Sequence, residues 1–305
     1  MIENVPYFTV FTPTLNRAYI LPKVYEALQS QTFQDFEWII IDDGSSDDTR
    51  ILVQEWIADG ILNIRYFYQH NQGKHVAHNL AVEHAVGELF LVFDSDDSCV
   101  SNALERFKSL WEGIPSNQRN QFSTLSVLCF GEDGTVLGRE YPESPIDGIT
   151  LDEQRRLRSF GDKWGINVTR VLKDFKFPVF PDEKFIAESL VWNRISQHYS
   201  ARFVNEKLCR KIYRADGLTH AAVKLRVNNP SGATLVYFEE LSTLTVFSEK
   251  LKSAINFVRF SLRNKSYVVP RPGLRTFLFV FIAFPAGVLF FLHDTYKISK
   301  INRVR

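Results

Sequence analysis

The sequence predicts an α/β fold built on a mainly parallel sheet, for three reasons. Between residues 5 and 131, short apolar runs alternate with amphipathic stretches in the order expected of repeated strand–helix units. The strand candidates are nearly continuous apolar runs, which is typical of strands covered by helices on both faces. The chain has 305 residues, of which 45% are hydrophobic, so it can bury a sizeable core.

The predicted elements follow one another in chain order. The first half reads as strand FTVFT, helix RAYILPKVYEALQSQ, strand FEWIIID, helix TRILVQEWIADG, strand NIRYFYQ, helix KHVAHNLAVEHAVG and strand ELFLVF. Residues 132–163 are rich in Gly, Pro and charge and predict a mobile or irregular connection. Beyond it we expect a helix in KFIAESLVWNRISQHY, a strand in ARFVNEKLCRKIY and helices from about residue 216 to 275.

Charge and cysteine content narrow the class of protein. The 36 basic and 35 acidic residues nearly cancel, so nothing indicates a nucleic-acid partner. The three cysteines are far apart in sequence and form no C-x-x-C pair, which argues against a disulfide framework and a thiolate metal site. The first 17 residues lack the features of a signal peptide, so we expect a cytoplasmic catalytic domain.

Polar clusters follow three of the predicted strands: TPTLNR at 12–17, DDGSSDDT at 42–49 and DSDD at 94–97. Any one alone reads as a turn or a helix cap. Asp94 and Asp96, however, lie two apart on an extended segment, so their carboxylates point to the same side and favour a shared cation. Mg²⁺ or Mn²⁺ prefers such oxygen ligands and keeps positions open for phosphate. Gly73 and Lys74 precede a helix, where phosphate can also bind.

These motifs, taken in order, resemble a known family. The series TPTLNR, IIIDDGSSDDT and NQGKHVAHNLAVEHAVGELFLVFDSDD is similar to the family-2 inverting glycosyltransferases of GT-A fold, bacterial cell-surface polysaccharide type. That family shows PTYNR, then DDGS, then N-x-G followed by D-x-D at a strand end. The resemblance implies a Rossmann-like sheet, a nucleotide-sugar donor such as a UDP-sugar, and a saccharide or lipid-linked saccharide acceptor.

The resemblance also implies a division of the chain. Residues 1–131 would form the nucleotide-sugar-binding half of the GT-A domain, and residues 132–215 its acceptor-binding half. Residues 216–305 would form a helical extension that carries the hydrophobic segment 276–292.

Residue roles carry over at the matching positions. Pro13 and Thr14 would line the nucleoside pocket, and Asp42 or Asp43 would hydrogen-bond the nucleobase, expected to be uracil.

The third motif would hold the rest of the donor. Asp94 and Asp96 would bracket the ribose and the metal, Ser95 between them would bind the nucleotide sugar, and Asp97 is a further candidate metal ligand. Metal there would stabilise the charge that develops on the leaving diphosphate.

Three more residues take roles from the resemblance. Lys74 and Asn79 would lie in the segment that closes over the nucleotide. The segment FPDEKFIAESLVWNRI is similar to the one in which an acidic pair, often Glu-Asp, supplies the catalytic base. Here that pair is Glu188-Ser189, so we assign the base to Glu188, with an exposed helical glutamate as the alternative interpretation.

The hydrophobic segment 276–292 holds 14 apolar residues among 17 and no charge. Seventeen residues make about 25 Å of helix, short of a hydrocarbon core of about 30 Å, and Pro285 and Gly287 interrupt the segment further. Basic residues flank both ends. We expect an in-plane helix or shallow hairpin on the cytoplasmic face of the membrane, ahead of a true span or a buried helix pair.

Two other functions stay open at this point. A metal-dependent nucleotidyltransferase would use a similar nucleotide-binding sheet. A non-catalytic, membrane-associated GT-A scaffold is the second alternative, because Ser189 replaces the expected Asp.

Overall fold

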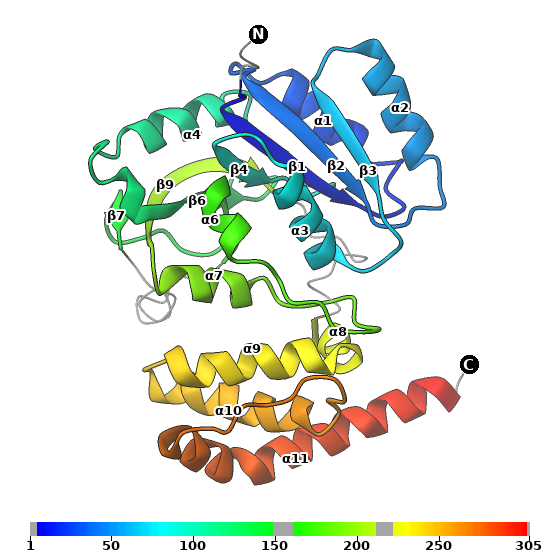
Figure 1. The fold of residues 1–305 in the computed structure, drawn as a ribbon, viewed down its shortest axis with the longest axis vertical. Helices are drawn as coiled ribbons and strands as arrows, with labels where there is room; N and C mark the ends of the chain where they lie inside the picture. Colours follow the sequence, from blue (N-terminus) through cyan, green and yellow to red (C-terminus); the bar gives the residue numbers. More distant parts are fainter. Residues whose placement is uncertain (1–4, 149–160, 212–221, 304–305) are drawn as a thin grey trace. The chain divides into compact units, whose positions relative to one another are not determined.

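The computed structural model describes residues 5–148, 161–211 and 222–303 (Figure 1). The chain forms two compact units. The N-terminal unit comprises Met1–Lys176 and Val191–Arg214, and the C-terminal unit comprises Phe177–Leu190 and Ala215–Arg305. Part of the predicted connection, residues 149–160, lies outside the described residues. Its described part includes β7 (Ile146–Asp147), which pairs with a later strand.

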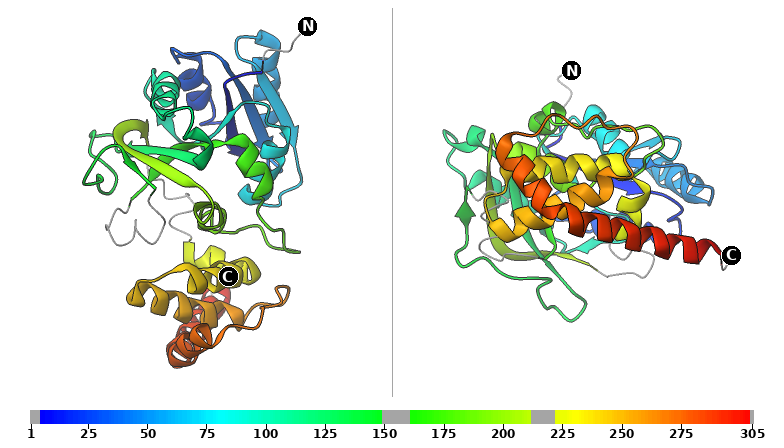
Figure 2. Two further views of the ribbon diagram at one scale, coloured as in Figure 1. Left: turned by 60° about the vertical axis from the view of Figure 1, so that its left-hand side comes forward. Right: turned by 90° about the horizontal axis from the view of Figure 1, so that it is seen from below.

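The N-terminal unit is built on one nine-stranded mixed sheet (Figure 2). Its first four strands are parallel, in the order β3-β2-β1-β4, and they are β1 (Phe8–Thr14), β2 (Phe36–Asp42), β3 (Ile64–Tyr68) and β4 (Leu89–Val92). The sheet continues through β8 (Lys163–Val168), β6 (Phe122–Phe130), β9 (Ser200–Arg210) and β5 (Ser98–Cys99). The antiparallel strand β8 joins the parallel part to the rest.

Helices connect the parallel strands as the sequence predicts. They are α1 (Pro22–Gln29), α2 (Thr49–Asp59) and α3 (Lys74–His84), followed by α4 (Ala103–Glu112), the 3₁₀ turn η1 (Arg119–Gln121), α6 (Thr169–Asp174) and α7 (Ser189–Ser196). Every residue of β2 is buried, and β1 is buried except for Pro13. Burial on both faces explains why these strands are apolar throughout rather than alternating. The predicted fold class is confirmed.

The strand order places a crossing point in the sheet. The chain moves outward from β1 to β2 and β3, then returns to add β4 on the other side of β1. The loops that follow β1 and β4 therefore diverge at neighbouring strand ends, which is where open α/β sheets bind their ligands.

One predicted helix is shorter than expected. Of the stretch 184–199, only α7, Ser189–Ser196, is helical. The preceding residues are held by another helix: Lys184 N donates to Asn229 Oδ1 at 2.6 Å, and the Glu183 carboxylate accepts from Ser231 N and Gly232 N at 2.6 and 2.8 Å. These contacts satisfy backbone groups outside α7, so the segment stays irregular.

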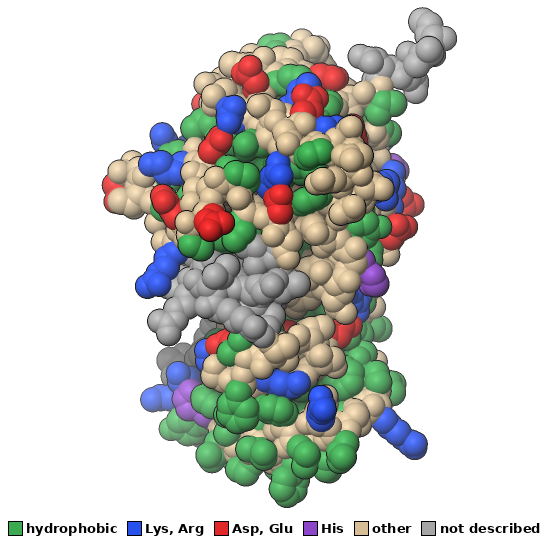
Figure 3. Space-filling view, turned by 90° about the vertical axis from the view of Figure 1, so that its left-hand side faces the viewer, with side chains coloured by type: hydrophobic (Ala, Val, Ile, Leu, Met, Phe, Trp, Pro, Cys, Tyr) green, Lys and Arg blue, Asp and Glu red, His purple; other side chains and the backbone are tan. Residues whose placement is uncertain are grey.

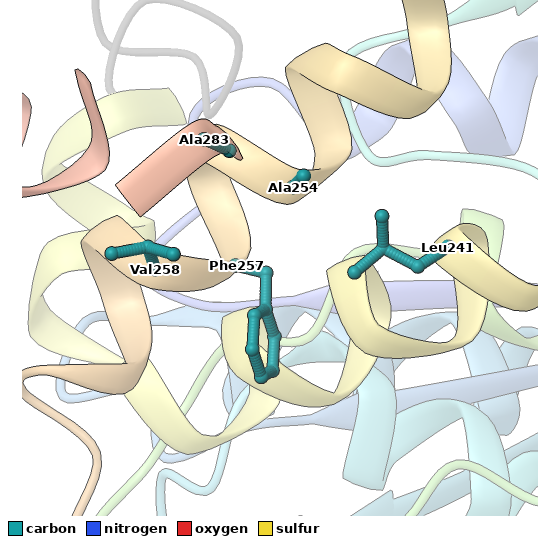
Figure 4. Close-up of a cluster of buried hydrophobic side chains, with 5 residues drawn as sticks. All are labelled: Leu241, Ala254, Phe257, Val258 and Ala283. Carbon is teal, nitrogen blue, oxygen red and sulfur yellow. The ribbon is translucent and has the colours of Figure 1, made fainter. Parts of the chain in front are cut away.

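The C-terminal unit is helical, with α8 (Ala222–Asn228), α9 (Pro230–Thr243), α10 (Phe247–Ser261) and α11 (Leu274–Arg303). Its core joins three of them: Leu241 comes from α9, Ala254, Phe257 and Val258 come from α10, and Ala283 comes from α11 (Figure 4).

The expectation that the hydrophobic segment 276–292 is interrupted is wrong. Pro285 and Gly287 do not interrupt it, because α11 is one helix of 30 residues that passes through both. Pro285 is exposed, and Gly287 faces α10, where an added Cβ would lie 2.5 Å from Val258 Cβ. A hairpin is thus excluded. The stretch Leu274–Lys297 is long and apolar enough to cross a membrane, judged by length and composition alone.

Candidate active site

The site forms where β4 ends. Asp94 follows β4 at the crossing point, and Lys74 Nζ lies 2.7 Å from its Oδ1. On the other side, Lys211 Nζ lies 2.9 Å from Asp97 Oδ2. Three carboxyl groups, counting Asp96, therefore gather with two lysine ammonium groups, and both lysines come from elements distant in sequence.

Lys74 owes its position to Asp43. The Asp43 carboxylate accepts hydrogen bonds from Gln72 N at 2.8 Å, Gly73 N at 2.9 Å and Gln69 Nε2 at 2.7 Å. Gly73 has a φ of 93°, which a residue with a Cβ rarely adopts. The carboxylate therefore shapes the turn from which α3 begins, and Lys74 is the first residue of that helix.

Asp42 is also engaged within the protein. It is 1% exposed, and it accepts from Ser45 N and from the Tyr66 hydroxyl, both at 2.7 Å. Burial and the Asp42 carboxylate together raise the pKa of Tyr66, so the phenol stays protonated and keeps donating. Both aspartates of the second motif thus order the loops around the site.

The loop after β1 is fastened to the loop after β2. Asn16 N donates to Ser45 Oγ at 2.8 Å, and Asp43 N donates to the Thr14 carbonyl at 2.8 Å. The Thr14 hydroxyl is buried and has no hydrogen-bond partner in the described part of the chain. Pro13 beside it is partly exposed. A buried hydroxyl of this kind is unusual and suits a ligand atom.

Burial and the two lysines set the charge of the cluster. Burial opposes ionisation of Asp94, but Lys74 and Lys211 outweigh it and lower the pKa of Asp94. Burial raises the pKa of Asp97 to about 7, and the neighbouring Asp94 carboxylate adds to that rise, against the attraction of Lys211. Burial would lower the pKa of Lys211, but Asp97 and Asp94 raise it, so this lysine is charged.

Of the three carboxylates at the end of β4, two are suited to bind a divalent cation. Among residues 5–148, 161–211 and 222–303, no three His, Cys, Asp or Glu side chains form a metal cluster. Asp94 and Asp96 are partly exposed and offer the hard oxygen ligands that Mg²⁺ and Mn²⁺ prefer, which suits a site with only two protein ligands. Asp97 is 6% exposed and paired with Lys211, so it is the least accessible of the three.

The remaining predicted residues divide between the units. Ser95 is buried between Asp94 and Asp96, and Asn79 is partly exposed on α3. Glu188 is exposed and stands immediately before α7, in the segment Phe177–Leu190 of the C-terminal unit. The N-terminal unit alone brings together Lys74, Asp94 and Asp97.

Sequence reasoning missed Lys211. It follows β9, whose last residue Arg210 lies between Phe130 of β6 and Ser98 of β5. Strand β5 begins directly after Asp97, so this pairing brings Lys211 to the acidic motif. No local motif marks this lysine; only the strand order does.

The cysteines lie closer together than their spacing in sequence indicates. Cys209 on β9 pairs in register with Cys99 on β5 and with Cys129 on β6, so the three form a row across the sheet. All three are free thiols in this structure; Cys129 and Cys209 are buried, and Cys99 is partly exposed.

Comparison with known proteins decides the family. Residues 9–117 match the family model described as "Glycosyl transferase family 2". These residues form a family-2 glycosyltransferase domain. The family resemblance stated from the sequence motifs and the predicted enzyme class are both confirmed. The chain is a glycosyltransferase.

One curated relative and two solved structures illustrate the likeness. The chain is 28% identical, over 72% of its length and 69% of the relative's, to the Campylobacter jejuni GalNAc(5)-diNAcBac-PP-undecaprenol beta-1,3-glucosyltransferase. Its fold is similar to S. aureus TarS 1-349 in complex with UDP-GlcNAc, with TM-score 0.61 and 20% identity over 84% of this chain and 72% of that one. It is also similar to the mannosyltransferase PcManGT from Pyrobaculum calidifontis in complex with GDP-Man and Mn²⁺, with TM-score 0.55 and 14% identity over 96% and 88%.

Proposed function

We propose that the protein transfers a sugar from a UDP-sugar to a hydroxyl group of a saccharide or lipid-linked saccharide, with inversion at the anomeric carbon. The observation that carries this proposal is the acidic end of β4, where Asp94 and Asp96 stand beside Lys74 at the crossing point of the sheet. The uridine donor is supported by TarS, a neighbour of the same fold solved with UDP-GlcNAc.

The charges at the site favour a metal. Three carboxyl groups face two ammonium groups, so the cluster offers no excess positive charge to a diphosphate. We assign Asp94 and Asp96 as the residues that hold Mn²⁺ or Mg²⁺, with Asp97 bound instead to Lys211. When bound there, the metal supplies Lewis-acid stabilisation of the leaving diphosphate.

The chain's own residues position the donor. Lys74 and the positive end of α3 lie beside Asp94 and attract the diphosphate, because a helix N-terminus and a lysine both favour negative charge. Asp43 fixes the turn that carries Lys74. Pro13 and the buried Thr14 hydroxyl are assigned to the nucleoside side of the pocket, and Ser95 and Asn79 to the donor.

Glu188 is assigned as the general base. The acceptor oxygen forms a bond to the anomeric carbon while the bond from that carbon to the diphosphate breaks, and the electron pair leaves with the diphosphate. The proton of the acceptor hydroxyl passes to the Glu188 carboxylate, an effect typically worth about 10² to 10⁴ in rate. Ser189, the next residue, has a hydroxyl group that is too weak a base to accept a proton at neutral pH.

The acceptor and the location follow from the relative and from α11. The Campylobacter enzyme is named for an undecaprenol-linked substrate, and α11 provides an apolar helix. We therefore assign a lipid-linked saccharide of a bacterial cell-surface polysaccharide as the acceptor class, and the cytoplasmic face of the cell membrane as the place of reaction.

The first test is calorimetric binding of UDP with Mn²⁺ and again with EDTA. We expect binding with Mn²⁺, its loss with EDTA, and its loss in Asp96→Ala. Asp59→Ala, an exposed carboxylate at the end of α2, is the matched control and should bind as the wild type does. Equal binding with Mn²⁺ and with EDTA would refute the metal assignment.

The second test concerns the base. Glu188→Gln should keep the UDP affinity and lower transfer by about 10² or more, since only the proton acceptor is lost. Glu206→Gln, a partly exposed glutamate of the other unit, serves as the control. Full transfer activity in Glu188→Gln would show that the base is another group, and UDP binding without any turnover in the wild type would favour a non-catalytic scaffold.

A further inference from the structure

Helix α11 exposes a continuous apolar face. In Figure 3 hydrophobic side chains gather over the surface formed by the C-terminal helices. Exposure of large apolar side chains on this scale marks a surface that is covered by a partner or a membrane. The apolar face repeats at helical spacing, and six of its residues, each more than half exposed, are Leu274, Phe277, Phe281, Ile282, Leu289 and Tyr296.

The opposite side of α11 is packed against α10. Ala283 is 1% exposed within the shared core, and Gly287 lies so close to Val258 that no side chain fits between the helices. Phe247 at the start of α10 packs against Phe279 of α11, with ring centroids 5.5 Å apart and the ring planes tilted by 54°. Only a narrow stripe of α11 is used for this contact, and the apolar face is left outside it.

Polar contacts fasten the same two helices further along. Arg259 of α10 donates from Nε and Nη2 to the two carboxylate oxygens of Asp294, at 2.7 and 2.8 Å. Arg263 donates to the Phe291 carbonyl at 2.9 Å. Contacts advance in the same direction along both helices, so α10 and α11 run parallel and side by side.

The region around the apolar face is strongly basic. Residues 247–303 contain ten Lys and Arg against two Asp and Glu, in a chain whose total charge is +1. Lys250 lies over the Phe279 ring, and Arg271 and Arg275 flank the start of α11. An apolar surface within a basic region complements anionic lipid.

We propose that the apolar face of α11 lies flat in the surface of an anionic bilayer, with α10 on its water side, and that α11 does not cross the membrane. A crossing α11 would carry the parallel α10, with Glu249, Lys250 and Lys252, to membrane depth, which is costly. If α11 separated from α10 instead, Asp294 would lose its partner Arg259. This inference deepens the proposed function, and rests on it for the membrane as the place of the acceptor.

The binding test uses the full chain and preformed vesicles. We expect flotation with vesicles of mixed phosphatidylglycerol and phosphatidylcholine, and at least about tenfold weaker association with phosphatidylcholine alone or at high salt. Phe281→Glu should lower association about tenfold or more, because a charge replaces an exposed ring. Ile51→Glu, on the exposed face of α2, is the matched control and should bind vesicles as the wild type does.

A labelling test distinguishes an α11 that lies in the bilayer surface from an α11 that crosses the bilayer. In a Cys99→Ser background, which removes the one partly exposed native thiol among Cys99, Cys129 and Cys209, Arg271→Cys and Lys297→Cys each place a reactive thiol at one end of the apolar stretch. Added to sealed vesicles, both thiols should react with an impermeant maleimide outside. Protection of one end and not the other would show that α11 crosses and would overturn the proposal.

Other outcomes also decide the matter. Equal association of Phe281→Glu and the wild type would overturn the proposal, as would a vesicle-free dimer that Phe281→Glu makes monomeric, since the occupant would then be a second copy. UDP binding, measured on the same variants, is expected to be unchanged. A wild-type chain that binds UDP but does not associate with anionic vesicles would refute the docking alone. A wild-type chain that associates with the vesicles but does not bind UDP would refute the donor site alone.

Discussion

Folded proteins usually bury apolar side chains and expose charged ones, and the two units depart from this rule in opposite ways. The N-terminal unit keeps charge inside: Asp97 is 6% exposed and held by Lys211. The C-terminal unit keeps apolar groups outside: Phe281 is 70% exposed on α11. Buried charge and exposed apolar surface are the two arrangements that a folded chain normally avoids. Each is expected where a partner completes the structure, and the partners that we propose are a nucleotide sugar for the first unit and a lipid surface for the second.

The largest effect should come from breaking the buried ion pair. Lys211→Met leaves Asp97 without its cation, and removing one member of a buried pair costs about 3 to 5 kcal/mol. Urea unfolding followed by tryptophan fluorescence reports this unit alone, because all five tryptophans lie in it. Lys207→Met, on the exposed side of β9, should change stability by about 0.5 kcal/mol or less. Similar losses of unfolding free energy in both variants would mean that the Lys211–Asp97 pair stabilises the unit no more than an exposed lysine does.

A smaller effect should come from forcing the helices of the second unit apart. Gly287→Leu places a side chain where a Cβ would already lie 2.5 Å from Val258, and such overpacking costs about 1 to 3 kcal/mol. The loss should appear in far-ultraviolet circular dichroism, with the tryptophan transition unchanged. Gly273→Leu is the control, because a Cβ there meets nothing within 4 Å. A shift of the tryptophan transition in Gly287→Leu would show that the units do not respond independently.

The most gradual effect should come from pH. Burial lowers the pKa of His75 to about 4, so as pH falls from about 6.5 the unfolded chain takes up a proton first and the N-terminal unit loses stability, by no more than about 1.4 kcal/mol per pH unit. In the C-terminal unit, burial opposes ionisation of Asp294, but the charge of Arg259 outweighs burial and lowers the pKa of Asp294. The Arg259–Asp294 pair therefore stabilises the C-terminal unit until pH falls below the usual aspartate range.

Urea midpoints between about pH 7 and pH 4.5 test this separation. The urea midpoint of the tryptophan transition should fall as pH is lowered over that range. In His75→Leu the midpoint should depend less on pH. An unchanged pH dependence in His75→Leu would assign the acid sensitivity to another group.

Local pattern was enough to predict part of this molecule. β1, β2 and β4 could be predicted because burial on both faces makes them nearly apolar throughout, and Asp94 could be predicted because it follows such a run. Lys211 was not readable, since its place depends on β9 pairing with β5 and β6, which is a long-range choice. Pro285 gave a wrong prediction for a related reason: α11 continues through it while Gly287 packs against α10, a long-range contact that local helix propensity does not reveal.

The order in which the chain is made has a consequence for Glu183. This carboxylate accepts hydrogen bonds from Ser231 and Gly232, which stand 48 and 49 residues later. At the usual rate of synthesis, about 5 to 20 residues per second, Glu183 waits several seconds for them. Strand β9 is made during that wait. The hydrogen bonds of Glu183 can therefore form only after β9 has been made, and a chain that ends at Arg214 leaves this carboxylate permanently without them.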